Sequence, residues 1–392
     1  MVPRLPCENW ESHCWAPQTQ ALPLILAMHN SAAQPDQYQR LFEEKVGRAL
    51  RLFAPFAPPE PTLYASPPLG YRLRAEFRMW HDGDALDYVM FPPGKPKEHI
   101  VISDFPIAAS RITDCMPVLQ QSLQGSSTLR QRLFQVEFLS SCSGNLLITL
   151  VYHRPLDAEW ESAATALAEQ LNCHLIGRSR KQKIIIGKDW VDESLHIRGN
   201  TYEYRQPEQC FTQPNGSINQ HMIEWLLAHT PPCQTDLLEL YCGVGNFTLP
   251  LAHRFRRVLA TELSKRATAA ATHNAAANHI SNLELARLSA AEMSQAMAGD
   301  RPFRRLAALR EPLSSFEFET LLVDPPRAGL DSDTLGLAKG FAQIFYISCN
   351  PKSLIENMAE LNKTHSIEAL AFFDQFPYTE HLESGVILKR RP

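Results

Sequence analysis

At 392 residues the chain is longer than a single hydrophobic core usually supports, which predicts two domains. Its 44% hydrophobic and 20% charged residues are typical of a folded protein and exclude an intrinsically disordered chain. The net charge of -4 gives no overall signal for a nucleic-acid partner. No run approaches the ~18 apolar residues that span a bilayer, so we expect a cytoplasmic protein without membrane contact.

The cysteines show no sign of a cross-linked or metal-bound framework. There are nine of them, widely scattered and without a C-x-x-C pair. This pattern argues against disulfides, a zinc site and an iron–sulfur cluster. We expect no metal site and interpret most of the thiols as small buried apolar groups.

Residues 35–205 have the pattern of an α+β domain with a mainly antiparallel sheet. Residues 1–34 fit no pattern, which predicts a disordered tail with Met28 as an alternative start. Expected helices span residues 36–53, 106–124 and 157–172, and expected strands span residues 71–80, 86–91, 133–141, 145–153, 173–179 and 182–187.

Two stretches of this domain are locally basic. Residues 71–84 carry three arginines, and residues 178–188 carry Arg178, Arg180, Lys181, Lys183 and Lys188. A solvated strand face explains each stretch taken alone. A phosphate-binding role needs an RNA substrate that is argued independently.

Residues 206–392 alternate between strand and helix. Expected strands span residues 236–242, 257–264, 283–288, 320–326, 343–349, 368–374 and 385–390, and helices are expected between most of them, for example at 265–280. Such alternation predicts a mainly parallel, doubly wound α/β sheet, which binds ligands at the carboxyl ends of its strands.

A glycine turn follows the first of these strands. Gly243-Val244-Gly245 brings backbone close to a ligand, although it lacks the full G-x-G-x-x-G of a dinucleotide site. Glu262 ends the next strand, where a carboxylate can accept hydrogen bonds from ribose hydroxyls. Together they favour an adenosine-containing cofactor, with S-adenosyl-L-methionine among the candidates.

The stretch "LLVDPPRAGL" places Asp324 after a buried strand, with two prolines that prevent strand or helix from continuing. It resembles the D/N-P-P-Y/F loop of amino-group methyltransferases. Arg327 stands at the aromatic position, which weakens an amino-methylation reading and supplies a guanidinium for a phosphate or a base.

The stretch "YISCNPKS" places Cys349 at the end of a parallel strand, before a helix expected near Pro351. Helix-terminal N–H groups favour a thiolate there, and the polar, turn-forming surroundings fit a buried structural cysteine poorly. Glu383 precedes the last strand in "YTEHLESGVIL". A lone glutamate at such a position is usually solvated, but with Asp324 and Glu262 it is expected at the same sheet edge.

Five motifs together resemble the RNA uracil-5-methyltransferases: "FTQPN", "LELYCGVGNFTL", "VDPPRAGLD", "YISCNP" and "HLESGV". The stretches "YRLRAEFRMWHDGD", "LFQVEFL" and "DQFPYTEHLESGV" resemble the tRNA (uracil-5-)-methyltransferases in particular, over roughly Asp36 to Lys389. The ribosomal-RNA relatives typically carry a cysteine cluster for an iron–sulfur centre, and many add a TRAM domain. Neither pattern is present in this sequence.

The resemblance implies a Rossmann-like class I methyltransferase domain that uses S-adenosyl-L-methionine, with an RNA-recognition domain before it. Cys349 would attack carbon 6 of uracil as the nucleophile, and Glu383 would remove the carbon 5 proton. Arg327 would lie near a flipped-out uracil, and Phe134 and the basic strands would grip the RNA. The residues implied to hold the cofactor are Gln213, Tyr241, Asn246, Glu262 and Asp324.

The favoured substrate is the T-loop uridine of tRNA, and T-loop-like RNAs such as that of tmRNA are further candidates. A ribosomal-RNA uracil methyltransferase is the alternative within the same fold. An RNA chaperone that has kept the fold without the reaction is the non-enzymatic alternative.

Overall fold

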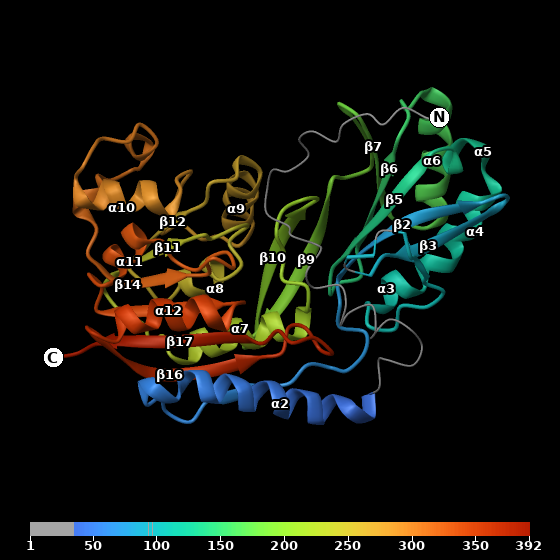
Figure 1. Cartoon of the computed structure of the whole chain (residues 1–392). Coiled ribbons are helices and arrows are strands. Elements are labelled where there is room, and N and C mark those ends of the chain that lie inside the picture. Colours follow the sequence, from blue (N-terminus) through green and yellow to red (C-terminus); the bar gives the residue numbers. More distant parts are fainter. Residues whose placement is uncertain (1–34, 93, 96) are drawn as a thin grey trace.

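The computed structural model describes residues 35–92, 94, 95 and 97–392. Two large sheets, each covered by helices, stand side by side, and a two-stranded sheet lies between them (Figure 1). The predicted tail of residues 1–34, with Met28, lies outside the described residues. Within the described part of the chain, no helix combines the length and the apolar sequence needed to cross a membrane.

The amino-terminal sheet has seven strands in the order β4-β3-β2-β5-β6-β7-β8. Neighbouring strands in this sheet are antiparallel except for β6 and β7, which run parallel. The strands are β2 Arg74–Asp82, β3 Ala85–Met90, β4 Ile100–Val101, β5 Leu133–Ser140, β6 Leu146–Tyr152, β7 His174–Ser179 and β8 Gln182–Ile186. The expected α+β arrangement is confirmed.

Helices cover one face of this sheet. They are α3 Ser110–Thr113, α4 Cys115–Gly125, α5 Ser127–Arg130 and α6 Ala158–Gln170, and their apolar side chains share a core with the strands. Gly177 of β7 lets α6 pack closely, because an added Cβ would lie 2.2 Å from the Trp160 ring. The other face of the sheet is turned toward the rest of the molecule (Figure 1).

The carboxy-terminal sheet has eight strands in the order β1-β16-β17-β15-β14-β11-β12-β13. The run from β15 to β13 is parallel, and β17 is antiparallel to both of its neighbours. The strands are β1 Thr62–Tyr64, β11 Asp236–Leu240, β12 Arg257–Thr261, β13 Leu283–Ala286, β14 Phe318–Val323, β15 Gln343–Ser348, β16 His365–Phe373 and β17 Glu383–Arg390. The doubly wound sheet is therefore confirmed, with the strand order reversing at β11.

Two separate apolar clusters bury the two faces of this sheet. One face packs on α2 Pro35–Phe53, α10 Ala290–Ala298, α11 Ser332–Ala338 and α12 Pro351–Leu361. The other packs on α7 Gly216–Ala228, α8 Thr248–Ala252 and α9 Lys265–Ala277. Short 3₁₀ turns occur at Ala54–Phe56, Leu306–Ala308 and Leu313–Ser315. Because parallel strands are buried on both faces, they read as apolar runs in the sequence.

The first helix and strand belong with the carboxy-terminal sheet. The helix α2 (blue in Figure 1) lies along β16, and β1 pairs in parallel with β16 through Thr62 and Ala371. The domain boundary predicted at residue 205 assigned this segment to the amino-terminal domain, whereas the structure places it on the carboxy-terminal sheet. The spacing of apolar residues correctly predicts a helix, but it does not say which sheet the helix packs against.

A hairpin that the sequence pattern did not predict lies between the two large sheets (Figure 1). The strands β9 Trp190–Ile197 and β10 Asn200–Pro207 form a two-stranded antiparallel sheet that contacts α7 and α9. Buried and exposed residues alternate along both strands. Arg198 and Gly199, both with positive φ, form the turn.

Candidate active site

The register of the parallel strands brings three predicted residues to one level. Leu240 pairs with Thr261 on one side and with Val323 on the other. The next residues along these strands are Tyr241, Glu262 and Asp324, so all three follow the carboxyl ends of adjacent strands. This is the switch point at which a doubly wound sheet opens toward a ligand.

The backbone after β11 is held in an uncommon conformation. Tyr241 has φ 63°, and Gly243 and Gly245 have φ 56° and 90°. Glycine adopts this region without steric cost, whereas a tyrosine there carries strain of a kind that clusters at functional sites. The N–H of Gly245 donates to the Cys242 carbonyl at 2.9 Å, which closes the turn before α8.

Glu262 is already oriented by backbone donors. Its Oε2 accepts from the N–H of Gly243 at 3.1 Å, and its Oε1 accepts from the N–H of Ser264 at 2.7 Å. The carboxylate therefore bridges the glycine turn and the start of α9. Each oxygen keeps a further lone pair that can accept a hydroxyl.

The amide side chains of the predicted cofactor residues are paired with other amides. Asn246 exchanges two hydrogen bonds with Asn219 of α7, at 2.8 and 2.9 Å. Gln213 is buried, and its Oε1 accepts from Gln375 Nε2 at 2.9 Å. Sequence reasoning did not single out Gln375, although a polar pair, Asp374 and Gln375, directly after an apolar strand at this sheet edge is a usable signal.

Cys349 and Glu383 lie opposite each other on neighbouring strands. Ser348 of β15 pairs with Ser384 of β17, so the residue after the first and the residue before the second are adjacent across the ladder. Glu383 is only 3% exposed and Cys349 is partly buried. The predicted nucleophile and proton acceptor therefore meet at one point of the edge.

The thiol is not a stabilised thiolate in this structure. Burial, together with the carboxyls of Glu383 and Asp324, raises the pKa of Cys349 to about 12, and the lowering effect of Arg327 is smaller. The helix end that was expected to favour a thiolate therefore does not bring the pKa of this thiol below its ordinary value in the free protein. Desolvation of the charged form outweighs these favourable interactions.

Three carboxyls at this edge resist ionisation. Burial raises the pKa of Asp324 to about 7, and burial together with Asp324 raises the pKa of Glu383 and of Glu239 to about 8. The Oε2 atoms of Glu239 and Glu383 have no hydrogen-bond partner among the described residues. Such a cluster suits a ligand that carries positive charge. Sequence reasoning missed Glu239, whose signal is an acidic residue inside an otherwise apolar strand.

Two asparagines fix the loop that carries Arg327. Asn350 donates from Nδ2 to the Arg327 carbonyl at 2.8 Å and caps α12. Asn357, in the buried stripe of α12, accepts from Leu330 N at 2.9 Å and from Tyr346 OH at 2.7 Å. Arg327 itself is partly buried, and its charge acts on Cys349. The loop is therefore tied to the helix that follows the thiol.

Phe134 lies elsewhere, on β5 of the amino-terminal sheet. The Arg78 guanidinium carbon is 3.8 Å from its ring centroid, and the His153 ring is 4.1 Å away. These contacts make Phe134 part of a cationic aromatic array contributed by three strands or strand ends. A base that stacks here meets this array, not an isolated ring.

Part of the predicted basic surface is engaged within the protein. Arg178 makes two hydrogen bonds to Glu208, and Lys183 pairs with Asp189 at 2.7 Å. Arg266 of α9 reaches the same two acids. This network joins the amino-terminal sheet to the segment before α7, so these two cations serve the domain junction.

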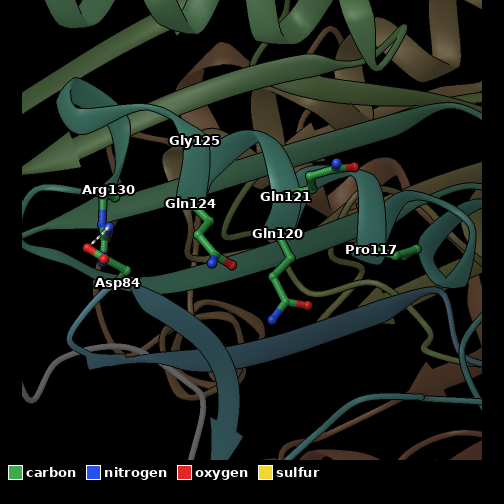
Figure 2. Close-up of a pocket in the computed structure, with 7 residues that line it drawn as sticks. All are labelled: Asp84, Pro117, Gln120, Gln121, Gln124, Gly125 and Arg130. Atoms are coloured by element: carbon green, nitrogen blue, oxygen red, sulfur yellow. Dashed lines mark ion pairs between the residues drawn. The ribbon is translucent and has the colours of Figure 1, made fainter.

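A surface hollow on the amino-terminal domain contains none of the predicted site residues. Figure 2 shows it beside α4, with an ion pair between Arg130 and Asp84 at its rim. It is lined by Asp84, Pro117, Gln120, Gln121, Gln124, Gly125 and Arg130. Across the described part of the chain, no group of three or more His, Cys, Asp or Glu side chains is arranged to hold a metal ion.

A doubly wound sheet with a strained glycine turn, a carboxylate at the end of the next strand and a nearby thiol is typical of S-adenosyl-L-methionine-dependent methyltransferases. The family model of the tRNA (Uracil-5-)-methyltransferases matches residues 37–391. The chain belongs to this family, and the cofactor implied by the sequence resemblance is confirmed.

Relatives and a solved structure support this assignment. A tRNA/tmRNA (uracil-C(5))-methyltransferase of Pseudomonas entomophila is 53% identical over 91% of this chain and 98% of its own. One of Aromatoleum aromaticum is 53% identical over 92% and 97%. The fold resembles that of a Pyrococcus abyssi tRNA (uracil-54, C5)-methyltransferase in complex with S-adenosyl-L-homocysteine, with a TM-score of 0.68, 18% identity and coverage of 91% and 86%.

Proposed function

We propose that this chain methylates carbon 5 of the T-loop uridine of tRNA through a covalent adduct between Cys349 and uracil. The observation that carries the proposal is the meeting of Cys349 and Glu383 across β15 and β17, beside the cofactor turn. The relatives from Pseudomonas and Aromatoleum act on tRNA and tmRNA, and the Pyrococcus protein on uracil 54 of tRNA. These names favour the corresponding position here, in the cytoplasm where tRNA works.

Uracil needs a nucleophile because its carbon 5 is too electron-poor to accept a methyl group unaided. The Cys349 thiolate adds to carbon 6, a sulfur–carbon bond forms, and the ring electrons move toward carbon 5 and the carbonyl oxygen as an enolate. Carbon 5 then takes the methyl group. Glu383 accepts the carbon 5 proton, the freed electron pair restores the ring double bond, and the sulfur leaves.

S-adenosyl-L-methionine supplies the methyl group on a positively charged sulfur. Glu262, oriented by Gly243 and Ser264, would accept the ribose hydroxyls. Asp324, with its raised pKa, would gain from the positive charge. The other groups proposed to hold the cofactor are Gln213, Tyr241 and Asn246.

The reactive groups of the free protein are predominantly protonated at neutral pH. The pKa of Cys349 is about 12 and that of Glu383 is about 8. Arg327 lowers the pKa of the thiol, which supports its proposed place beside the uracil. Ionisation of the site is therefore expected to accompany ligand binding.

The amino-terminal domain would hold the RNA while the target base leaves its stack. A uracil inside a folded loop cannot reach the sheet edge, so the nucleotide must be flipped out. Phe134, with Arg78 and His153 around it, offers a surface on which a base can stack. This recognition by shape and stacking extends to tRNA-like T-loops such as that of tmRNA.

Mass spectrometry of RNA from cells with and without the protein tests the proposal. Loss of 5-methyluridine from the T-loops of tRNA and tmRNA, with ribosomal RNA unchanged, is the expected result. Loss from ribosomal RNA would favour the ribosomal alternative. Retention of every cellular function by Cys349→Ala would favour a chaperone and reject the methylation mechanism.

A further inference from the structure

The segment from Asp374 to Leu382 links β16 to β17 and ends directly before Glu383. It is anchored at its start, because Asp374 and Gln375 are fully buried at the carboxyl end of β16. Neither residue has a role in the mechanism above. Their contacts connect the amino-terminal helix to the reactive edge.

Asp374 is bound by two side chains of α2. Lys45 Nζ lies 2.7 Å from Oδ1, and Tyr38 OH donates to Oδ2 at 3.0 Å. Lys45 also donates to the Phe376 carbonyl at 2.8 Å, and the side chains of the ion pair are 2% and 0% exposed. A buried pair of this kind specifies one geometry more than it adds stability.

Tyr38 is itself held in place. Its hydroxyl accepts from the Ser66 N–H at 2.7 Å, and Ser66 Oγ accepts from Asn215 Nδ2 at 2.7 Å. Asn215 ends the "FTQPN" segment that carries Gln213. The helix α2 therefore braces both the segment before Glu383 and the segment that carries the cofactor glutamine.

Gln375 stands between these two segments. Its Nε2 donates to Gln213 Oε1 at 2.9 Å and contacts the sulfur of Met222 at 3.3 Å. It also lies two residues beyond Phe373, which pairs with Glu383 across β16 and β17, and its amide lowers the pKa of that carboxyl. One buried residue thus contacts a proposed cofactor ligand and lies beside the proposed proton acceptor.

We propose that Gln375 is a positioning residue for Glu383, held in place by the contact of Asp374 with Lys45 and Tyr38 of α2. The inference rests on the proposed function, because it assigns Glu383 the removal of the carbon 5 proton. It makes the first described helix of the chain a part of the catalytic apparatus, although that helix is remote in sequence from the site.

Gln375→Met tests the role of the Gln375 amide. Methionine keeps the length of the side chain and packs on Met222, but it donates no hydrogen bond. Attack and methyl transfer should persist while release slows, so the covalent protein–RNA adduct should accumulate on a denaturing gel. We expect kcat to fall about tenfold, less than the ~10²–10⁴ of a whole general base, with KM for tRNA unchanged.

The pH profile adds a readout that loss of folding does not move. Without the Gln375 donor, the pH at half-maximal rate should rise. The other groups that act on this carboxyl or on its thiol partner are Asp324, Cys349 and Arg327, and all of them stay in the variant. Gln375→Asn, which keeps the amide but withdraws it by one methylene, is the second variant if the methionine does not fold.

A double variant tests the contact between α2 and Asp374. Lys45→Met with Asp374→Asn removes both charges together, so no lone charge is left buried. The same accumulation of adduct is expected, to a smaller extent. His365→Phe is the matched control, because His365 bonds the Phe341 carbonyl at the opposite end of β16. It should lower the melting temperature and leave the adduct fraction unchanged.

The outcomes separate the two proposals. Adduct in Glu383→Gln but wild-type kinetics and pH profile in Gln375→Met would overturn the positioning role and leave the proposed function intact. No adduct in Glu383→Gln together with normal turnover would reject Glu383 as the acceptor, and the inference would fall with it. Equal adduct fractions in the double variant and the wild type would confine the positioning role to Gln375 and overturn the role of α2.

Discussion

The two ends of the ligand edge differ in how they hold their carboxylates. At β11 and β12, Glu262 is partly exposed and its two oxygens already accept backbone N–H groups. At β15 and β17, Glu383 is buried, with one oxygen unpartnered and a pKa of about 8. Glu262 has its partners before a ligand arrives, whereas Glu383 is kept in an unfavourable environment. Desolvation of a carboxyl thus lies where bonds change, and backbone strain lies at the glycine turn after β11.

The largest effect is expected at the buried end. Cys349→Ser should abolish methylation, a fall of more than about 10³-fold, since a serine hydroxyl at this site is far harder to ionise than the thiol. Incorporation of labelled methyl groups into tRNA measures the effect. A serine variant that methylates at the native rate would remove the basis of the proposed mechanism.

Glu383→Gln should separate the two halves of the reaction. Adduct formation and methyl transfer remain, and turnover falls by about 10²–10⁴-fold because no group accepts the carbon 5 proton. The denaturing gel should show a protein–RNA band that the wild type lacks. Addition of Cys349→Ser to this variant is the control and should remove the band.

At β11 and β12, a substitution of Glu262 should weaken binding of the cofactor. Glu262→Ala loses charge-assisted hydrogen bonds worth about 1.5–3 kcal/mol, which corresponds to roughly a 10- to 150-fold rise in the cofactor Kd. Titration calorimetry with S-adenosyl-L-homocysteine measures it. A fall in kcat at saturating cofactor, without weaker binding, would contradict the division between the two ends.

A further effect is on stability instead of activity, and it depends on pH. The folded pKa of Glu383 is about 8, above the value of about 4.3 in an unfolded chain, so folding favours the protonated form. Stability from this group is present below pH ~4.3 and is lost as pH rises toward 8. Glu383→Gln should therefore gain stability over the wild type by a few kcal/mol between pH 5 and 8, since one pKa unit is about 1.4 kcal/mol.

Melting temperatures of both proteins at the two pH values check this prediction. A stability difference that stays constant with pH would show that the buried carboxyl carries no penalty. Glu262→Ala is the control from the other end, because its carboxylate is partly exposed and hydrogen-bonded.

The sequence allowed the edge to be predicted because parallel strands end at one side of a sheet. That rule brings together Tyr241, Glu262, Asp324 and Cys349 from separate motifs, and the registers agree with it. The rule does not predict the pKa values of the side chains that meet at this edge. The pKa of the thiol depends on burial and on the approach of Glu383 and Asp324 in space, and neither is visible in a strand pattern.

Long-range contacts were the other part that the sequence did not reveal. Gln375 and Asn357 are ordinary polar residues until the fold places them against Gln213 and Leu330. The spacing of apolar residues predicted α2 as a helix, yet its partners Asp374 and Phe372 follow more than 300 positions later. Local periodicity carries no information at that separation.

The pairing of β1 with β16 has a consequence for how this protein can be divided. A fragment that begins at residue 206 would leave β16 as an open edge and Asp374 without its ion-pair partner Lys45. The catalytic half is therefore not a free-standing module. The segment with α2 and β1 and the segment with β16 and β17 must both be present for the carboxy-terminal sheet to be complete.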